Sequence, residues 1–279
     1  MIERRITFII GDEGIPSWKL NQLKTLAGYF RAVVVMQNVT RLCQANAEQP
    51  VRIMSLGCMP GDLCQLVIEG SDAELAYMVL TDFVAEQFLL VKTSGKKKNR
   101  NACSVDSRDK TNTAFYLPFE LAISTRDLQV EEIGLVQPTE AKEMVLARLC
   151  RMLNPENPDL LRQLMQERER VSSTCMGNGI ALPHIMSSEI KLPAMALIQI
   201  PQAIEWGSNR GPVTRVIAMA LPFPAQRPHI EAFAHFSQAL LAPEYCRLLT
   251  ENIQAEALKA LLLHTLSRPF TANCDTPKG

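Results

Sequence analysis

The segment GNGIALPHIMSS places His184 directly after a proline and close to a glycine-rich turn. The chain has only four histidines in 279 residues. Gly177 and Gly179 allow backbone N–H groups to approach an anion, and Asn178 tolerates the left-handed conformation between them. Pro183 restrains the backbone that carries the imidazole. Because a neutral imidazole is a competent nucleophile toward phosphorus, the segment is suited to phosphoryl transfer.

Phosphoryl transfer depends mainly on positioning and on cationic or N–H stabilisation of the transferred group. Arg168 and the imidazole of His229 could supply these contacts if the fold brings them to His184. A histidine after a proline is also typical of a turn or of a partly buried structural residue. A zinc site made by His184, His229 and His235 is a further alternative, but the last two lack the i, i+4 spacing of a helical metal pair.

The length and composition favour a globular protein with two domains, because 279 residues exceed one typical compact domain. The formal net charge is zero, so overall charge does not favour nucleic acid or an acidic membrane as a partner. No apolar segment reaches the roughly 18 residues needed to span a bilayer, and the first residues do not resemble a secretory signal. The eight cysteines are scattered without a C-x-x-C pair, which is typical of reduced thiols. We therefore expect a cytoplasmic protein.

Residues 1–91 show the order strand, helix, strand, short helical turn, strand and helix. Strands are predicted in RRITFII, AVVVMQ and LCQLVIEG, and a helix in SWKLNQLKTLAGYF. The closing helix in SDAELAYMVLTDFVAEQF is predicted to open with a capping box formed by Ser71 and Glu74. Its predicted apolar face comprises Leu75, Met78, Val79 and Phe83. This order predicts an α+β domain with helices on one face of an antiparallel sheet.

Residues 92–114 are polar and lack hydrophobic periodicity, so we expect a linker over residues 92–122. Residues 123–268 alternate helices and strands, which predicts an α/β domain. The expected helices are AKEMVLARLCRML, NPDLLRQLMQERERV, PHIEAFAHFSQALL and AEALKALLLHTL, and the expected strands are AMALIQI and VTRVIAMAL. His264 is expected to be a packing residue on the last helix. The polar residues 269–279 are expected to form an unordered tail.

The stretch ERERVSSTCMGNGIALPH resembles the phosphorylation segment of the mannitol–fructose class of enzyme IIA domains, in the bacterial phosphoenolpyruvate-dependent sugar phosphotransferase system. AIEWGSNRGPVTRVIAMALP and PHIEAFAHFSQALLAPE resemble later segments of that family. The resemblance implies a mixed sheet flanked by helices and needs no metal or organic cofactor. It implies that His184 accepts the phosphoryl group, that His229 is the supporting histidine and that Arg168 is the cationic contact. PAQRPHIEAF departs from the Gly-Glu-His or Gly-Asp-His motif that precedes the second histidine in the family. Pro228 is therefore expected to shift the position of His229.

DEGIPSWKLNQLKTLAGYF and IMSLGCMPGDLCQLVIEGSDAELAYMVLTDFV resemble HPr, the small histidine phosphocarrier of the same system. HPr has Gly-Leu-His-Ala-Arg-Pro where this chain has GIPSWK, so Pro16 stands at the histidine position and Trp18 at the arginine position. Proline has no nucleophilic nitrogen and cannot carry phosphate. Gln49 stands where some HPr proteins have a regulatory serine. Trp18 and Lys19 then either form a docking surface or belong to a domain that keeps the HPr fold but has no chemical role.

The two resemblances together imply a phosphohistidine carrier. A separate phospho-HPr-type protein would donate to His184, which would pass the group to an enzyme IIB working with a membrane IIC component. The transported sugar would be of the fructose or mannitol kind, with no nucleic acid partner and no direct membrane insertion. The alternative is a regulatory binding protein in which phosphorylation of His184 reports sugar-transport status.

Overall fold

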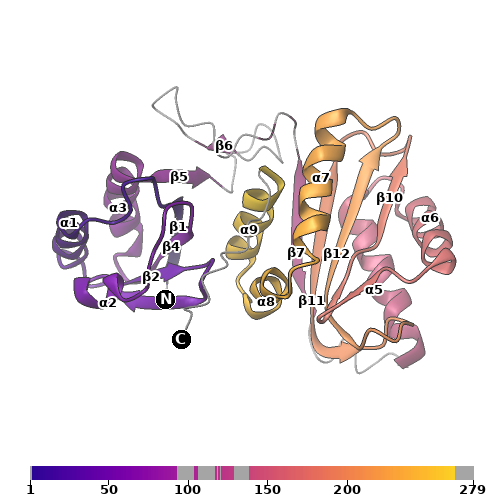
Figure 1. The fold of residues 1–279 in the computed structure, drawn as a ribbon, viewed down its shortest axis with the longest axis horizontal. Coiled ribbons are helices and arrows are strands. Elements are labelled where there is room, and N and C mark those ends of the chain that lie inside the picture. The colour runs from indigo at the N-terminus through magenta and orange to yellow at the C-terminus, as the bar shows by residue number, and fades with distance from the viewer. Residues whose placement is uncertain are drawn as a thin grey trace, which may run out of the picture. The chain divides into compact units, whose positions relative to one another are not determined.

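The computed structural model describes residues 2–92, 104–105, 117, 119, 121–128 and 138–267. The chain forms two compact units, each built around its own sheet (Figure 1). The first unit contains Met1–Gly95 together with Glu256–His264, and the second contains Leu117–Ala255. Most of the predicted linker and the whole predicted tail lie outside the described residues. Within the described part of the chain, no helix has both the length and the apolar character needed to cross a bilayer.

The sheet of the first unit is antiparallel and has the order β3-β2-β4-β1-β5-β6. Its strands are β1 (Ile2–Ile9), β2 (Val33–Asn38), β3 (Cys43–Asn46), β4 (Leu63–Gly70), β5 (Leu89–Lys92) and β6 (Ser104–Val105). The described helices that precede β5 are α1 (Ser17–Ala27), α2 (Pro50–Met54) and α3 (Ala73–Gln87). This arrangement confirms the predicted α+β class.

The helices α1 and α3 pack against one face of this sheet. Alternate residues of β1, Ile6 and Phe8, share a buried cluster with Leu20 and Leu23 of α1 and with Leu80 of α3. Because side chains alternate across a strand, this spacing places them all on the helix-covered face. Burial of each large apolar side chain contributes about 1.5–3 kcal/mol, which makes this layer the main source of stability for the unit.

Helix α3 buries a different stripe from the one predicted. Its buried residues are Ala73, Ala76, Leu80, Phe83 and Val84. Of the predicted face only Phe83 is buried, whereas Leu75 and Met78 are 58% and 61% exposed. The helix carries apolar residues around most of its circumference, so periodicity alone does not select the face. The small alanines Ala73 and Ala76 allow α3 to approach β1 closely, and this close packing determines which face of the helix is buried.

The predicted capping box at the start of α3 is wrong. The N-cap is Asp72, one residue later than expected, and its side chain makes no capping hydrogen bond. Glu74 instead forms an ion pair with Arg4 of β1, with 2.6 Å between Oε2 and Nε. Asp72 accepts a hydrogen bond from the backbone N–H of Arg31 at 2.8 Å, and this bond lowers the pKa of the Asp72 carboxyl.

The second unit contains a mixed sheet with the path β7-β11-β12-β9-β8, and β10 pairs with β12. Its strands are β7 (Ala122–Asp127), β8 (Cys175–Gly177), β9 (Ile180–Ala181), β10 (His184–Ser187), β11 (Ala194–Ile204) and β12 (Val213–Pro222). Strands β11 and β12 are antiparallel, whereas β7, β9 and β10 each run parallel to a neighbour. The described helices that follow β7 along the chain are α5 (Pro138–Leu153), α6 (Pro158–Val171), α7 (Arg227–Ala239), α8 (Pro243–Glu251) and α9 (Ala255–Ser267). Most of α9 belongs to the first unit.

Both faces of this second sheet are covered. Helices α5 and α6 lie on one side and α7 on the other (Figure 1). Val216 and Ala218 of β12 share a cluster with Val145 and Leu149 of α5, and the intervening Ile217 is also fully buried. A mixed sheet flanked by helices was predicted, and the structure confirms it.

Two features of the C-terminal helices were not predicted. Helix α8 was not among the expected helices, and it begins at Pro243, which occupies its first turn. His264 of α9 is partly buried, and its Nε2 lies 3.2 Å from the carbonyl oxygen of Gly61 within the first unit. The imidazole therefore makes a polar contact in addition to the packing that was expected.

Candidate functional site

Backbone hydrogen bonds on both sides of His184 fix its position at the start of β10. The N–H of Leu182 donates to the carbonyl of Thr174 at 2.9 Å, and the carbonyl of Pro183 accepts from the N–H of Met219 at 2.9 Å. His184 itself is in parallel register with Met219. The imidazole therefore extends from a backbone that is tied into the sheet.

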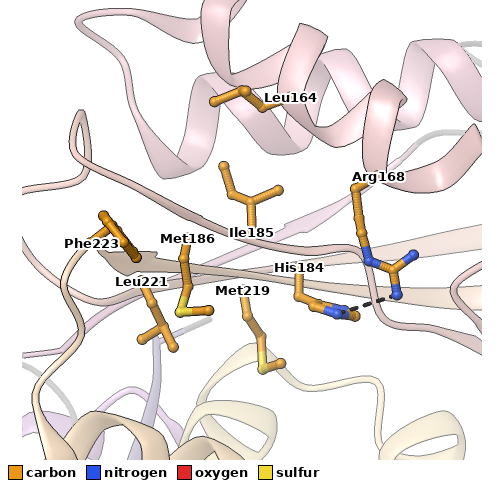
Figure 2. A pocket seen from close by; sticks show the side chains of 8 residues that line it. All are labelled: Leu164, Arg168, His184, Ile185, Met186, Met219, Leu221 and Phe223. Atoms are coloured by element: carbon orange, nitrogen blue, oxygen red, sulfur yellow. Dashed lines mark hydrogen bonds between the residues drawn. The ribbon is translucent and has the colours of Figure 1, made fainter. Parts of the chain in front are cut away.

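The hydrogen bonds of the His184 imidazole determine its tautomer. Nδ1 of His184 lies 2.9 Å from the carbonyl oxygen of Leu182, and Nε2 lies 3.4 Å from Nη2 of Arg168 (Figure 2). A carbonyl only accepts and an arginine only donates, so these partners assign the proton to Nδ1. Nε2 then keeps its lone pair and faces the guanidinium.

Arg168 is positioned by the end of helix α6. Its Nη1 lies 3.1 Å from both the carbonyl oxygen and the hydroxyl oxygen of Ser172, the C-cap residue. A cation in the last turn of a helix is also favoured by the helix dipole. Two of the three predicted site residues, Arg168 and His184, are thus brought together.

A cavity of about 550 Å³ opens beside these two residues. Its lining comprises Leu164, Arg168, His184, Ile185, Met186, Met219, Leu221 and Phe223. Figure 2 shows the guanidinium reaching from α6 toward the imidazole, with apolar side chains around them. An apolar surrounding lowers the local dielectric and strengthens the interaction of the guanidinium with an anion. At the rim, Phe223 and Met186 are 65% and 58% exposed, so a partner can reach the cavity.

His229 has a different environment. It lies in the first turn of α7, is 5% exposed, and packs its ring edge-on against Phe119 with 4.7 Å between the ring centroids. Burial lowers the pKa of His229, which keeps the imidazole neutral at pH 7. It is not among the described residues that line the cavity, so its supporting role stays a prediction. Among the described residues, no cluster of three or more His, Cys, Asp or Glu side chains could hold a metal ion, so the zinc alternative gains no support.

A buried polar network is centred on Glu169, the residue that follows Arg168 in the chain. Oε1 of Glu169 accepts from Nζ of Lys142 at 3.0 Å and from the N–H of Thr174 at 2.9 Å, and Oε2 accepts from the Thr174 hydroxyl at 2.6 Å. Lys142 also donates to the carbonyl of Trp206 at 2.9 Å, and the indole N–H donates to the Thr174 hydroxyl at 3.2 Å. This network fixes the chain segment that follows α6.

Sequence reasoning assigned no role to Lys142, Glu169 or Thr174. The last two lie inside the quoted phosphorylation segment, but Lys142 and the Trp206 carbonyl that it contacts are 64 residues apart. The network was therefore not recognisable from local spacing.

The glycine-rich turn adopts the left-handed conformation that was predicted. Gly177, Asn178 and Gly179 have φ values of +88°, +51° and +78°. The carbonyl of Gly179 accepts hydrogen bonds from the N–H groups of Thr214 and Arg215 at 2.9 and 3.0 Å. The turn therefore holds β9 against β12, and its predicted approach to an anion stays a prediction.

In the first unit, Pro16 is the N-cap of α1 and Trp18 is 54% exposed. Lys19 is only 6% exposed, and its Nζ donates to the carbonyl of Gln87 at 3.0 Å and lies 3.5 Å from the carboxylate of Glu13. Lys19 is therefore held in the fold, and of the two residues predicted as a docking surface only Trp18 is free to meet a partner.

Two family models match the chain. Residues 128–264 match the family described as "Phosphoenolpyruvate-dependent sugar phosphotransferase system, EIIA 2". Residues 16–86 match "PTS HPr component phosphorylation site". Together they cover about three quarters of the chain, and the first includes Arg168, His184 and His229.

Several named proteins are similar to about half of this chain. A multiphosphoryl transfer protein of Shigella flexneri is 26% identical over 139 residues, which are 48% of this chain and 17% of that protein. A nitrogen regulatory protein of Pseudomonas aeruginosa is 27% identical over 131 residues, 45% of this chain and 85% of that protein. The crystal structure of the nitrogen regulatory protein IIA-Ntr from Neisseria meningitidis covers 51% of this chain and 92% of its own, with 18% identity and a TM-score of 0.41. The two family matches show that the chain combines an HPr-like domain, whose residues 16–86 contain no histidine, with a type-2 EIIA domain of the phosphoenolpyruvate-dependent sugar phosphotransferase system.

Proposed function

We propose that the chain is a cytoplasmic phosphohistidine carrier that accepts a phosphoryl group on Nε2 of His184. The donor is a separate phospho-HPr-type protein, and the acceptor is an enzyme IIB that works with a membrane IIC component. The observation that carries this proposal is the 3.4 Å approach of Nη2 of Arg168 to Nε2, while Nδ1 is occupied by the carbonyl of Leu182.

In the proposed transfer, the lone pair of Nε2 attacks the phosphorus of the donor. A new N–P bond forms as the donor's N–P bond breaks, and the donor imidazole leaves with the bonding electron pair. The Nδ1 proton remains in its hydrogen bond to Leu182, so the transfer requires no proton movement on this chain. The guanidinium of Arg168 is placed to interact with the charged phosphoryl oxygens, which carry most of the charge in the transition state. Transfer to the IIB acceptor reverses these bond changes.

The donor is a separate protein because the first unit has no nucleophile at the expected position. Pro16 lacks a nucleophilic nitrogen, and Lys19 beside it is bound to Gln87 and Glu13. The HPr-like unit is then a spacer, a docking element or a regulator. The fructose or mannitol class of sugar rests on the resemblance of the phosphorylation segment.

Intact-protein mass spectrometry tests the acceptor step. The full chain is incubated with phosphoenolpyruvate, enzyme I and HPr, beside the variants His184→Gln and His235→Gln. We expect one acid-labile phosphoryl group that requires added HPr, is absent in His184→Gln and is retained in His235→Gln. Phosphorylation without HPr would overturn the account of Pro16. No phosphorylation by a donor that is active on another carrier would overturn the acceptor role.

A regulatory role is the second candidate. It is favoured by the relative named a nitrogen regulatory protein, of which this chain covers 85%. In that case phosphorylation of His184 changes the binding of a partner instead of supplying a IIB protein. Adding IIB to the purified phosphorylated chain distinguishes the two: the carrier loses its phosphoryl group within minutes, and the regulator keeps it.

A further inference from the structure

Three cysteines of the HPr-like unit gather around Asn38. Cys43 on β3 and Cys64 on β4 are both in register with Asn38 on the intervening β2. Residues in register across neighbouring strands project from the same face of the sheet. The Asn38 amide Nδ2 also lies 3.5 Å from Sγ of Cys58, in the loop that follows α2. All three cysteines are free thiols.

The thiols of Cys58 and Cys64 both lie beside Asn38 but differ in environment. Cys64 is fully buried, whereas Cys58 is partly exposed. The hydrogen bond from Cys64, together with the bond from Asn38, lowers the pKa of the Cys58 thiol. Burial raises the pKa of Cys64 well above its ordinary value. Cys58 is therefore the sulfur that ionises first and that solvent reaches.

The charges beside this pair compensate each other. The buried carboxylate of Asp62 accepts hydrogen bonds from Asn38 at 2.9 Å, from Nε of Arg41 at 2.8 Å and from the N–H of Met59 at 3.0 Å. Asp62 disfavours a thiolate at Cys58, and Arg41 favours it. Because the two form an ion pair, a Cys58 thiolate does not face an uncompensated carboxylate.

We propose that Cys58 and Cys64 form a reversible thiol–disulfide site, in which Cys58 reacts with a peroxide and Cys64 resolves the product. The Cys58 thiolate attacks one oxygen of hydrogen peroxide, which gives a sulfenic acid and releases hydroxide. The sulfur of Cys64 then displaces the sulfenic oxygen as water, and the S–S bond forms. A dithiol reductant reverses the reaction. This site is independent of His184 and of the proposed phosphoryl transfer.

The disulfide would tie the loop after α2 to strand β4. That loop connects α2, whose Val51 and Met54 are 77% and 58% exposed, to the centre of the sheet. A cross-link at this place restricts the movement of α2. The site thus offers a way to alter the surface of the HPr-like unit in response to oxidants.

Peptide mapping of the wild-type chain tests the pairing without any substitution. Trypsin is expected to release residues 42–52 with Cys43, and residues 53–92 with both Cys58 and Cys64. After peroxide treatment and blocking of free thiols, we expect the second peptide to carry an internal disulfide and the first to remain blocked at Cys43. A disulfide that joins the two peptides, or unchanged thiols at Cys58 and Cys64, would overturn the proposal.

Two variants of the full chain test the order of attack. In Cys64→Ala the reaction is expected to stop at a sulfenic acid on Cys58, which dimedone traps, whereas Cys43→Ala should still form the disulfide. Limited alkylation of the reduced wild type at pH 7 should label Cys58 at least about tenfold faster than Cys43 or the buried Cys150, since the thiolate is the reacting form. Equal labelling of Cys43 and Cys58 would contradict the assigned roles.

Discussion

The guanidinium of Arg168 bridges the end of helix α6 and the imidazole of His184. Its Nη1 is bound to two oxygens of Ser172, and its Nη2 lies 3.4 Å from Nε2 of the histidine. The cation that would face a phosphoryl group is therefore in place in the unphosphorylated chain. Its position depends on where α6 ends.

Replacing Arg168 with alanine is expected to slow phosphorylation of His184 about a hundredfold, because one preorganised cationic donor is lost. Rapid-quench measurement with phospho-HPr gives the rate. Arg170 lies two residues later on the exposed side of the same helix end, so Arg170→Ala is the matched control and should remain within about twofold of wild type. Similar rates for the two variants would show that the Arg168 contact does not assist transfer.

Removing Lys142 is expected to lower the free energy of unfolding. Lys142→Met leaves the carboxylate of Glu169, whose side chain is 5% exposed, without its ionic partner. We expect a loss of about 2 kcal/mol or more in urea denaturation, and partial recovery in the double variant Lys142→Met, Glu169→Gln. Lys191, which pairs with Glu156 in solvent, is the control, and Lys191→Met should change stability by less than about 0.5 kcal/mol. A loss at Lys142 no larger than at Lys191 would mean that the buried network adds little.

The stability of the chain is expected to fall below about pH 6.5 partly because of His229. Burial lowers its pKa in the folded chain, whereas the unfolded chain binds a proton near pH 6.5. Between these two values the unfolded state holds more protons, so acidification favours unfolding, and the contribution is absent above the unfolded pKa. In His229→Gln, the loss of stability between about pH 7.5 and 5.5 should be smaller than in wild type. The free energy of unfolding of both proteins is measured by urea denaturation at the two pH values. An equal loss in His229→Gln and in wild type would contradict this expectation.

Alanine at Gly179 is expected to destabilise the second unit more than alanine at Gly211. Both glycines have positive φ, +78° and +93°, so each substitution carries a backbone cost of about 1 kcal/mol or more. A β-carbon at Gly179 would also lie 3.1 Å from Oγ1 of Thr214, whereas the space at Gly211 is open. Thermal denaturation of the two variants should therefore differ, and equal midpoints would show that the strand contact at Gly179 adapts without cost.

Local sequence patterns predicted those helices and strands whose limits depend mainly on neighbouring residues. The predicted strand LCQLVIEG coincides with β4, Leu63–Gly70, because a run of apolar and β-branched residues ends at a glycine. The same holds for α6, which begins at Pro158 as predicted. Among the site residues, His184 and Arg168 were identified because both lie in one recognisable segment.

Local patterns did not predict the features that depend on contacts between residues distant in the sequence. In α3 the closely packed alanines select the buried face, although Leu75 and Met78 are more apolar. The contact of Lys142 with Trp206 and the meeting of Cys58 with Cys64 around Asn38 depend on strand register and helix packing. Neither follows from spacing along the chain.

The anchoring of Arg168 at Ser172 has a consequence for every encounter with a partner. A free arginine side chain has about 2 kcal/mol of rotamer entropy that is lost when the side chain is fixed. In this chain most of that loss accompanies folding, since the guanidinium is already held at both Ser172 oxygens. An arriving anion meets an ordered cation, so the ordering cost is not repeated at each cycle of binding and release.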